Sequence, residues 1–380
     1  MKRAPTRDIL WLFFITRLML ILVTYIAFIL FHTVKYSSTP VDIAALFGSW
    51  NHWDAANYVR IAQFGYQTPY DVAFFPLLPV LTAILSYPFG HGSTLLVATL
   101  ISNAALLGSL FVIYQLATDI GGDEVAHRTL LYLCIFPTAF YFFAPYNEAL
   151  FLLLSSSMFL AMRRQKWWLA GLLGLLAALA RSAGLLLIIP YLFEVWTTRS
   201  SIAATHQKMF FRIAPVILIP LGTALYGLYC LHISGNFFDF ASVQSHWGRQ
   251  TIWPWQGIVA SLVDLFWTQP FGTFNEVHLL LDLSATLGFI VLTILGWRKQ
   301  RASYTIWLAV LLLYILLSPA ITTPDPLESN QRFVLEMFPA FITLAMLAVK
   351  HPRLHQVITL IFPVLLATLS IIFIMNFWMV

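Results

Sequence analysis

Two carboxylate side chains lie at positions where they could take part in acid–base chemistry. Asp54 lies in a polar segment between apolar runs, and Glu148 lies near the end of one such run. Asp54 has two interpretations, a general base at the membrane–water boundary or a helix N-cap. They are compatible because a helix N-terminus stabilises a carboxylate. Glu148 is a candidate because acids in membrane segments tend to be functional; the alternative is an exposed residue at a helix start.

The sequence predicts neither a metal centre nor a cofactor site. His52, His246 and His278 are far apart, and no cysteine is near them. The sequence has no glycine-rich phosphate loop, nucleophile elbow or Ser/His/Asp arrangement. No second acid lies within three residues of Asp54, so an Asp-x-Asp metal pair is also missing. A metal-free site is therefore expected.

The composition is that of a membrane protein. Of 380 residues, 60% are hydrophobic and 10% charged, whereas soluble domains carry about 25% charged residues. This excludes a soluble domain, a disordered chain and a disulfide scaffold. The net charge of +5 comes from short basic clusters between apolar runs, which is typical of cytoplasmic loops and not of nucleic-acid binding. Cys134 and Cys230 lie in apolar runs and are expected to be buried free thiols.

The apolar runs predict an all-α, polytopic transmembrane bundle. About 20 apolar residues cross a bilayer, and nine runs are long enough: 9–33, 94–118, 128–145, 146–162, 212–233, 278–297, 303–320, 333–349 and 356–378. Residues 167–196 have basic residues on both sides and are expected to form a short helical hairpin turning near Ala183-Gly184. The run Phe74–Phe89 is broken by three prolines, which predicts an interfacial or re-entrant helix.

The distribution of basic residues predicts which loops lie on the cytoplasmic side of the membrane. Four of the 21 lysines and arginines, namely Lys35, Arg60, Arg249 and Arg332, fall in segments expected outside. Two more, Arg17 and Arg181, fall within apolar runs, so the other 15 are expected on the cytoplasmic side. Residues 1–380 then form a single transmembrane domain with three external loops, at about 34–93, 234–277 and 321–332.

The first external loop contains a predicted amphipathic helix. Ala55, Tyr58, Val59 and Ala62 follow the i, i+3, i+4, i+7 pattern of one helix face. Gly65 is placed to end the helix. Such a helix is expected to lie along the membrane interface with Asp54 at its start.

The same loop resembles a known family. The motif consists of Trp53-Asp54, then Ile61-Ala62 with Gly65-Tyr66, then Ala73-Phe74-Phe75-Pro76-Leu77-Leu78-Pro79. It is similar to the PIG-V-type mannosyltransferases of the GT-C superfamily of integral-membrane glycosyltransferases. Weaker similarities follow at Ala144-Pro145-Tyr146-Asn147-Glu148, at Ala180-Arg181-Ser182-Ala183-Gly184 and at Gln331-Arg332-Phe333. The resemblance covers residues 1 to about 350. The Arg181 element departs from the family pattern because it lacks the expected asparagine.

The resemblance implies a GT-C-like fold and a glycosyltransferase activity. The donor would be a polyprenyl-phosphate sugar, most often mannose, and the acceptor a hydroxyl of a glycan, lipid or protein. Transfer would occur on the extracytoplasmic face with inversion, Asp54 would be the general base, and no cofactor would be needed. The chain would be a multi-pass protein of the plasma membrane in a prokaryote, or of the endoplasmic reticulum in a eukaryote.

A phosphate leaving group needs a cation, and three arginines are candidates. Arg332 is preferred because it lies at the mouth of an expected span; its alternative is an interfacial, snorkelling side chain. Arg249 follows a Trp-containing polar segment that suits sugar stacking or interface anchoring. Arg181 could bind phosphate, or it could pair with Glu148 or a backbone carbonyl. Arg60 is expected to be solvated.

Two neighbours of Asp54 complete the candidate set. Trp53 and His52 are candidate substrate-binding residues, and for Trp53 the alternative is an anchor in an aromatic belt. Two other classes of function stay open. One is a transporter or lipid flippase, which the lack of a convincing internal repeat weakens. The other is a non-catalytic membrane subunit with the same fold, against which the intact Trp53-Asp54 pair argues.

Overall fold

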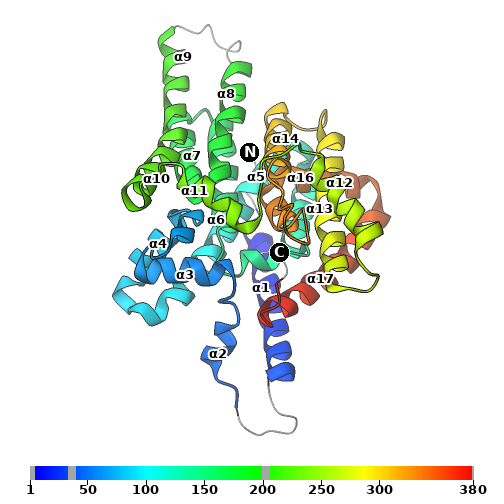
Figure 1. Ribbon diagram of the computed structural model, residues 1–380. Helices are drawn as coiled ribbons and strands as arrows, with labels where there is room; N and C mark the ends of the chain where they lie inside the picture. The colour runs from blue at the N-terminus through cyan, green and yellow to red at the C-terminus, as the bar shows by residue number, and fades with distance from the viewer. Residues whose placement is uncertain (1–4, 33–39, 199–205, 379–380) are drawn as a thin grey trace. The chain divides into compact units, whose positions relative to one another are not determined.

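The computed structural model describes residues 5–32, 40–198 and 206–378, and every regular element in these ranges is a helix (Figure 1). Lys35, and with it the start of the expected first external loop, lies outside the described residues. The chain forms two compact units. Unit 1 comprises Met1–Gly65, Leu78–Leu150 and Leu344–Met379, and unit 2 comprises Tyr66–Leu77 and Phe151–Thr343.

The elements are named α for α-helices and η for 3-10 helices, except η9, which is a π-helix. Those of unit 1 are α1 (Thr6–His32), α2 (Ile43–Gly48), α3 (Asp54–Phe64), α4 (Leu77–Ser86), η2 (Tyr87–Phe89), η3 (His91–Ser93), α5 (Thr94–Ile135), η4 (Ala139–Phe142) and α17 (Pro352–Ile374). Besides α4, whose first residue belongs to unit 2, two helices cross the boundary between the units, α6 (Glu148–Arg163) and α16 (Phe338–Lys350).

Those of unit 2 are η1 (Pro69–Ala73), α7 (Trp167–Ala180), η5 (Ser182–Leu187), α8 (Ile188–Thr197), α9 (His206–Ile213), η7 (Ala214–Ile217), α10 (Leu218–Ser234), α11 (Asp239–Ser242), η8 (Val243–Trp247), α12 (Gln256–Val263), η9 (Asp264–Thr268), α13 (Phe274–Gly296), α14 (Ala302–Leu316), α15 (Asn330–Phe333) and η10 (Val334–Glu336).

Several helices are fit to cross a membrane. Among the described residues, five helical segments are long and apolar enough: Thr6–Phe31, His91–Ile135, Met209–Ser234, Phe274–Gly296 and Pro352–Ile374. A sixth arises if Asn330–Glu336 and Phe338–Lys350, which meet at a bend of 84°, are counted as one. Shorter apolar helices lie at α4, α7, η5–α8 and α14. The all-helical membrane fold expected from the sequence is confirmed, whereas the count of nine spans stays a prediction.

Two expected spans, 94–118 and 128–145, join in α5. The helix breaks at Gly122, whose φ of 79° is easily reached only by glycine. The chain folds back there, since the rings of Tyr114 and His127 lie 5.2 Å apart. The second part ends at Ile135, ten residues earlier than expected. Phe136 is extended because it precedes Pro137, and η4 follows.

The predicted hairpin is confirmed. The helix α7 ends at Arg181, whose backbone is extended (φ −152°, ψ 150°), and η5 and α8 lead back. The Tyr191 hydroxyl donates to the Trp167 carbonyl over 3.4 Å, so α8 returns to the start of α7. In Figure 1, α7 to α10 lie side by side. The turn begins at Arg181, two residues before the expected position.

Gly184 allows η5 to lie against α7. A Cβ atom added at Gly184 would overlap the backbone carbonyl of Ala177. We expect Gly184→Ala to destabilise the fold by about 1–3 kcal/mol, because backbone atoms cannot move aside as a flexible side chain can. Thermal unfolding in detergent would measure this. Gly288→Ala is the matched control, since a Cβ there meets nothing within 4 Å. Equal losses in melting temperature for the two variants would contradict this account of the hairpin.

The first loop contains the predicted short helices. The helix α3 begins at Asp54 and ends before Gly65, and Ala55, Tyr58 and Val59 are buried as expected. Ala62 is only half-buried, and Ile61 is buried in its place. The helix α4 has 10 residues, which is about 15 Å of helix and too short to span a bilayer.

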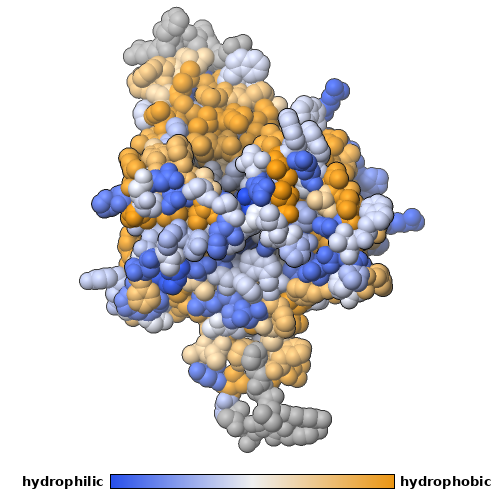
Figure 2. All heavy atoms as spheres, viewed as in Figure 1, coloured by the Kyte–Doolittle hydropathy of each residue, from blue (hydrophilic) through white to orange (hydrophobic). Residues whose placement is uncertain are grey.

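Large apolar side chains are exposed on the outer surface of several helices. On α8, α9 and α10 they include Trp196, Phe210 and Leu228, each more than half exposed. Figure 2 shows such side chains gathered over this part of unit 2. Soluble proteins rarely expose large continuous apolar patches, so these helix faces are suited to contact with lipid. The chain is a multi-pass membrane protein.

Candidate active site

The seven candidate residues fall into two groups. His52, Trp53, Asp54 and Glu148 belong to unit 1, and the three arginines belong to unit 2. In each unit, some of these residues lie near one aromatic side chain. For His52 and the segment that leads to Glu148 this side chain is Phe373, and for the arginines it is Phe333.

Trp53 has an unusual backbone conformation. It occupies the N-cap position of α3 with φ 56° and ψ −126°, a region that bulky residues rarely adopt. Its ring packs edge-on against Trp378, with 4.6 Å between centroids. Its indole N–H is buried and has no hydrogen-bond partner among the described residues. Backbone strain of this kind clusters at functional sites, and a ligand could accept the hydrogen bond of this N–H.

Asp54 is the first residue of α3, and the N-cap position belongs to Trp53. The N-cap interpretation of Asp54 is therefore wrong by one position. A carboxylate in the first helical turn is still stabilised by the helix dipole. The group thus lies at the start of a helix whose direction is fixed by its buried face.

The other acids of the first loop have structural contacts. The Asp42 carboxylate accepts a hydrogen bond from the Ala44 amide at 2.9 Å and caps α2. The buried Asp71 carboxylate accepts from the amides of Gln67 and Thr68 and from the Thr68 hydroxyl, at 2.6–3.0 Å. Both acids stabilise turns, and neither lies at the start of α3.

Phe373 connects His52 with the segment before α6. The ring centroids of His52 and Tyr146 lie 6.3 and 6.0 Å from that of Phe373. Glu148 starts α6 and is 1% exposed. Burial lowers the pKa of His52, and a backbone hydrogen bond with Ile374 opposes the shift. The lowered pKa favours the neutral imidazole, which can donate a hydrogen bond to a sugar hydroxyl or accept one from it.

Three guanidinium groups surround Phe333 in unit 2. The Cζ atoms of Arg181, Arg249 and Arg332 lie 5.1, 5.2 and 5.2 Å from its ring centroid. Arg181 also forms an ion pair with the buried Glu336, at 2.9 Å. The three cations outnumber the acids beside them, Glu336 and Glu328, so the region is suited to an anion such as a phosphate.

Arg249 is fixed by the backbone around it. Its guanidinium donates to the carbonyls of Ser318 (2.9 Å) and Glu328 (3.0 Å). Burial lowers the pKa of Arg249; Glu328 opposes this shift, and Arg332 and Arg181 add to it. The arginines therefore repel one another, and a bound anion would relieve this repulsion.

The short helix that carries Arg332 is attached to α13. Both carboxylate oxygens of Asp282 accept from Gln331, one from the backbone amide (2.8 Å) and one from the side-chain amide (3.1 Å). The Asn330 side chain donates to the Thr286 hydroxyl at 2.9 Å. Arg332 itself is 8% exposed. The position of Arg332 therefore depends on the buried hydrogen bonds of its neighbours Gln331 and Asn330, and not only on the membrane interface.

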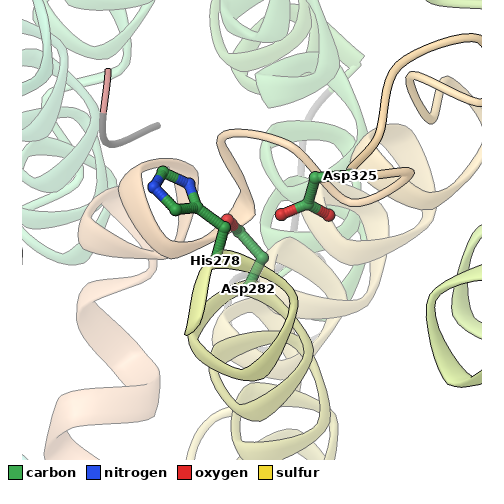
Figure 3. Close-up of side chains that lie close together, drawn as sticks. All are labelled: His278, Asp282 and Asp325. Carbon is green, nitrogen blue, oxygen red and sulfur yellow. The ribbon is translucent and has the colours of Figure 1, made fainter. Parts of the chain in front are cut away.

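Asp282 is a residue that sequence reasoning missed, and it lies near His278 and Asp325. One ligand atom from each of the three side chains lies within 4.8 Å of the other two (Figure 3). Burial raises the pKa of Asp325 to about 6. His278 and Asp282 are four residues apart and so share one face of α13. This spacing is visible in the sequence, whereas Asp325 is brought close only by the fold.

A family model described as Mannosyltransferase (PIG-V) matches residues 6–221. The chain belongs to this family. The matched region of this PIG-V family member contains His52, Trp53, Asp54, Glu148 and Arg181. Arg249 and Arg332 lie outside the matched region. The argument that they bind substrate therefore depends on the geometry around Phe333.

Curated relatives of this PIG-V family member include GPI alpha-1,6-mannosyltransferase 2 of Rattus norvegicus, 35% identical over 157 residues, and of Homo sapiens, 32% identical over 152 residues. Each match covers 38% of this chain. The chain spans about a third of the length of these relatives, 31% in both cases.

A solved structure supports the fold. ArnT of Cupriavidus metallidurans, determined with bound undecaprenyl phosphate, matches with a TM-score of 0.54 at 14% identity. The match covers 94% of this chain and 63% of ArnT. The GT-C-like fold expected from the sequence is confirmed.

Proposed function

We propose that this PIG-V family member is a membrane mannosyltransferase that transfers mannose from a polyprenyl-phosphate donor to an acceptor hydroxyl. The observation that carries the proposal is the group of three arginines around Phe333. A chain with so few charged residues gathers three cations in unit 2 with Glu336 as a buried acid beside them. This arrangement fits a lipid phosphate, which is also the leaving group of the reaction.

The reaction needs a base and a cationic site. The acceptor hydroxyl loses its proton as its oxygen bonds to the anomeric carbon of mannose, and Asp54 takes this proton. The bond between the anomeric carbon and the phosphate oxygen breaks with its electron pair going to the phosphate. Arg332 stabilises that charge with two parallel hydrogen bonds. Displacement in one step inverts the anomeric configuration.

The names of the relatives suggest the product. Both contain "alpha-1,6-mannosyltransferase". If this chain also makes an α-linkage by a single inversion, its donor carries a β-linked mannose. The ArnT structure was solved with undecaprenyl phosphate, which supports a polyprenyl phosphate as the lipid part. The acceptor is a hydroxyl of a glycan, lipid or protein.

A transfer assay tests the proposal. The purified chain would be incubated with polyprenyl-phosphate mannose, with the matching glucose donor and with a panel of glycan, lipid and peptide acceptors. We expect transfer from the mannose donor, and an α-mannoside by NMR from a β-linked donor. A retained anomeric configuration would exclude the single displacement. Movement of intact donor across vesicles without transfer would instead favour a flippase.

We also propose that the loop carrying Arg249 faces the extracytoplasmic side, opposite to the basic segment around Lys299. Thr251→Cys should react with an impermeant maleimide in intact cells, and Lys299→Cys only after permeabilisation. Thr251 and Lys299 are both exposed. The two native cysteines are fully buried, so little background labelling by the maleimide is expected. Equal labelling of both variants in intact cells would contradict the orientation.

A further inference from the structure

The cluster of His278, Asp282 and Asp325 has no part in the proposed reaction. His278 and Asp282 lie on α13, and Asp325 lies in the segment between α14 and α15 (Figure 3). Histidine with two carboxylates is a set of ligand types that divalent transition metals prefer. We propose that these three side chains form a binding site for one divalent transition-metal ion of the Zn²⁺ or Mn²⁺ type.

The state of the Asp325 carboxylate supports the proposal. Its Oδ1 atom accepts a hydrogen bond from the Leu327 amide at 3.0 Å. Its Oδ2 atom is buried, and the carboxylate lies within hydrogen-bonding reach of the Asp282 carboxylate. Two carboxylates this close attract each other only through a shared proton or a cation, and a metal ion would provide the cation. The Asp282 oxygens keep a lone pair each after accepting from Gln331.

The geometry permits binding after a small adjustment. The ligand atoms lie within 4.8 Å of one another, whereas ligands of a tetrahedral Zn²⁺ lie about 3.3 Å apart, given metal–ligand distances of about 2.0–2.2 Å. Side-chain rotation closes this difference. Two carboxylates can lie next to each other away from water only if they share a proton or bind a cation. A nitrogen ligand beside them favours the metal ion over the proton.

The metal ion would have a structural effect on the segment that carries Arg332. It would join α13 to the segment that precedes α15, while Asp282 also accepts the two hydrogen bonds from Gln331. The loop carrying Arg332 would then be fixed at two points. The inference depends only on contacts within unit 2 and holds whatever the donor of the transferase is.

Metal binding to the full chain tests the site. Protein purified in detergent and treated with EDTA would be dialysed against Zn²⁺, Mn²⁺ or Mg²⁺, and bound metal measured by mass spectrometry. We expect one equivalent of Zn²⁺ or Mn²⁺, no comparable binding of Mg²⁺, and a higher melting temperature with metal. His278→Gln and Asp325→Asn should each weaken binding by about 100-fold or more. Asn at 325 keeps an acceptor for the Leu327 amide, so the turn is preserved.

The matched control is Asp264→Asn. Asp264 is close enough to raise the pKa of Asp325 but lies outside the cluster, so this variant loses one nearby charge without losing a ligand, and metal binding should fall far less than in the two ligand variants. If the wild-type protein binds no stoichiometric metal, the two carboxylates share a proton and the proposal is overturned. Binding that survives both ligand substitutions would place the ion elsewhere and overturn it as well. Sugar transfer is not measured, so failure here is distinct from failure of the proposed function.

Discussion

Asp54→Asn should lower the turnover of mannose transfer by about 10²-fold or more, while expression, melting temperature and donor binding stay close to those of the wild type. The reason is that the amide cannot accept the acceptor proton. Asparagine is close to aspartate in size and shape, Trp53 holds the N-cap position, and the substitution removes one charge from the first turn of α3. Such a charge is worth about 0.3–1 kcal/mol. Turnover under saturating donor would measure the loss.

Asp42→Asn is the matched control for this substitution. Asp42 lies in the same loop and caps α2 through the Ala44 amide, and asparagine caps helices as well as aspartate does. We expect normal turnover. Asp54→Glu should also be slow, because one additional methylene moves the carboxylate by about an ångström and positioning tolerates little error. Near-wild-type turnover of Asp54→Asn would end the assignment of this residue as the base.

Arg332→Ala should weaken donor binding by about 10- to 100-fold. A hydrogen bond between charged partners is worth about 1.5–3 kcal/mol, and the remaining arginines keep part of the positive potential. Arg332→Lys should recover only part of the affinity, because an ammonium group cannot form two parallel hydrogen bonds. Titration with polyprenyl-phosphate mannose, with the melting temperature of each variant measured alongside, would test this.

Arg60→Ala is the control for Arg332. The Arg60 guanidinium donates to Asn57 on its own helix at 3.2 Å, and no role in donor binding is expected. The two variants should therefore differ by about tenfold or more in donor affinity. Arg332→Ala with normal donor affinity would return Arg332 to the role of a snorkelling interfacial side chain.

Much of the local structure could be predicted from sequence because local patterns determine it. The spacing of apolar residues in α3 predicted its buried face correctly, except that Ile61 is buried where Ala62 was expected. The basic residues on both sides of 167–196 predicted a hairpin before any contact was known. The early end of α5 also had a local signal that was overlooked, since Pro137 forces the preceding residue into an extended conformation.

The organisation of the candidate site could not be predicted in the same way. The sequence indicated Arg181, Arg249 and Arg332 separately, but only tertiary contacts bring them to the ring of Phe333. The pairing of Arg181 with Glu336 joins residues 155 positions apart. The same is true of Asp282 and Asp325, which no spacing rule connects. Long-range contacts between short polar segments leave no periodic signal in a single sequence.

The attachment of Gln331 to Asp282 couples the position of α15 to the tilt of α13. The helix α13 has 23 residues and is about 34 Å long, slightly more than the hydrocarbon thickness of a typical bilayer. A helix longer than the local bilayer tilts to match it. Because Asp282 holds α15 to α13, tilting would carry the Arg332 guanidinium along with the helix. Bilayer thickness would thereby set the depth at which this guanidinium meets a lipid headgroup.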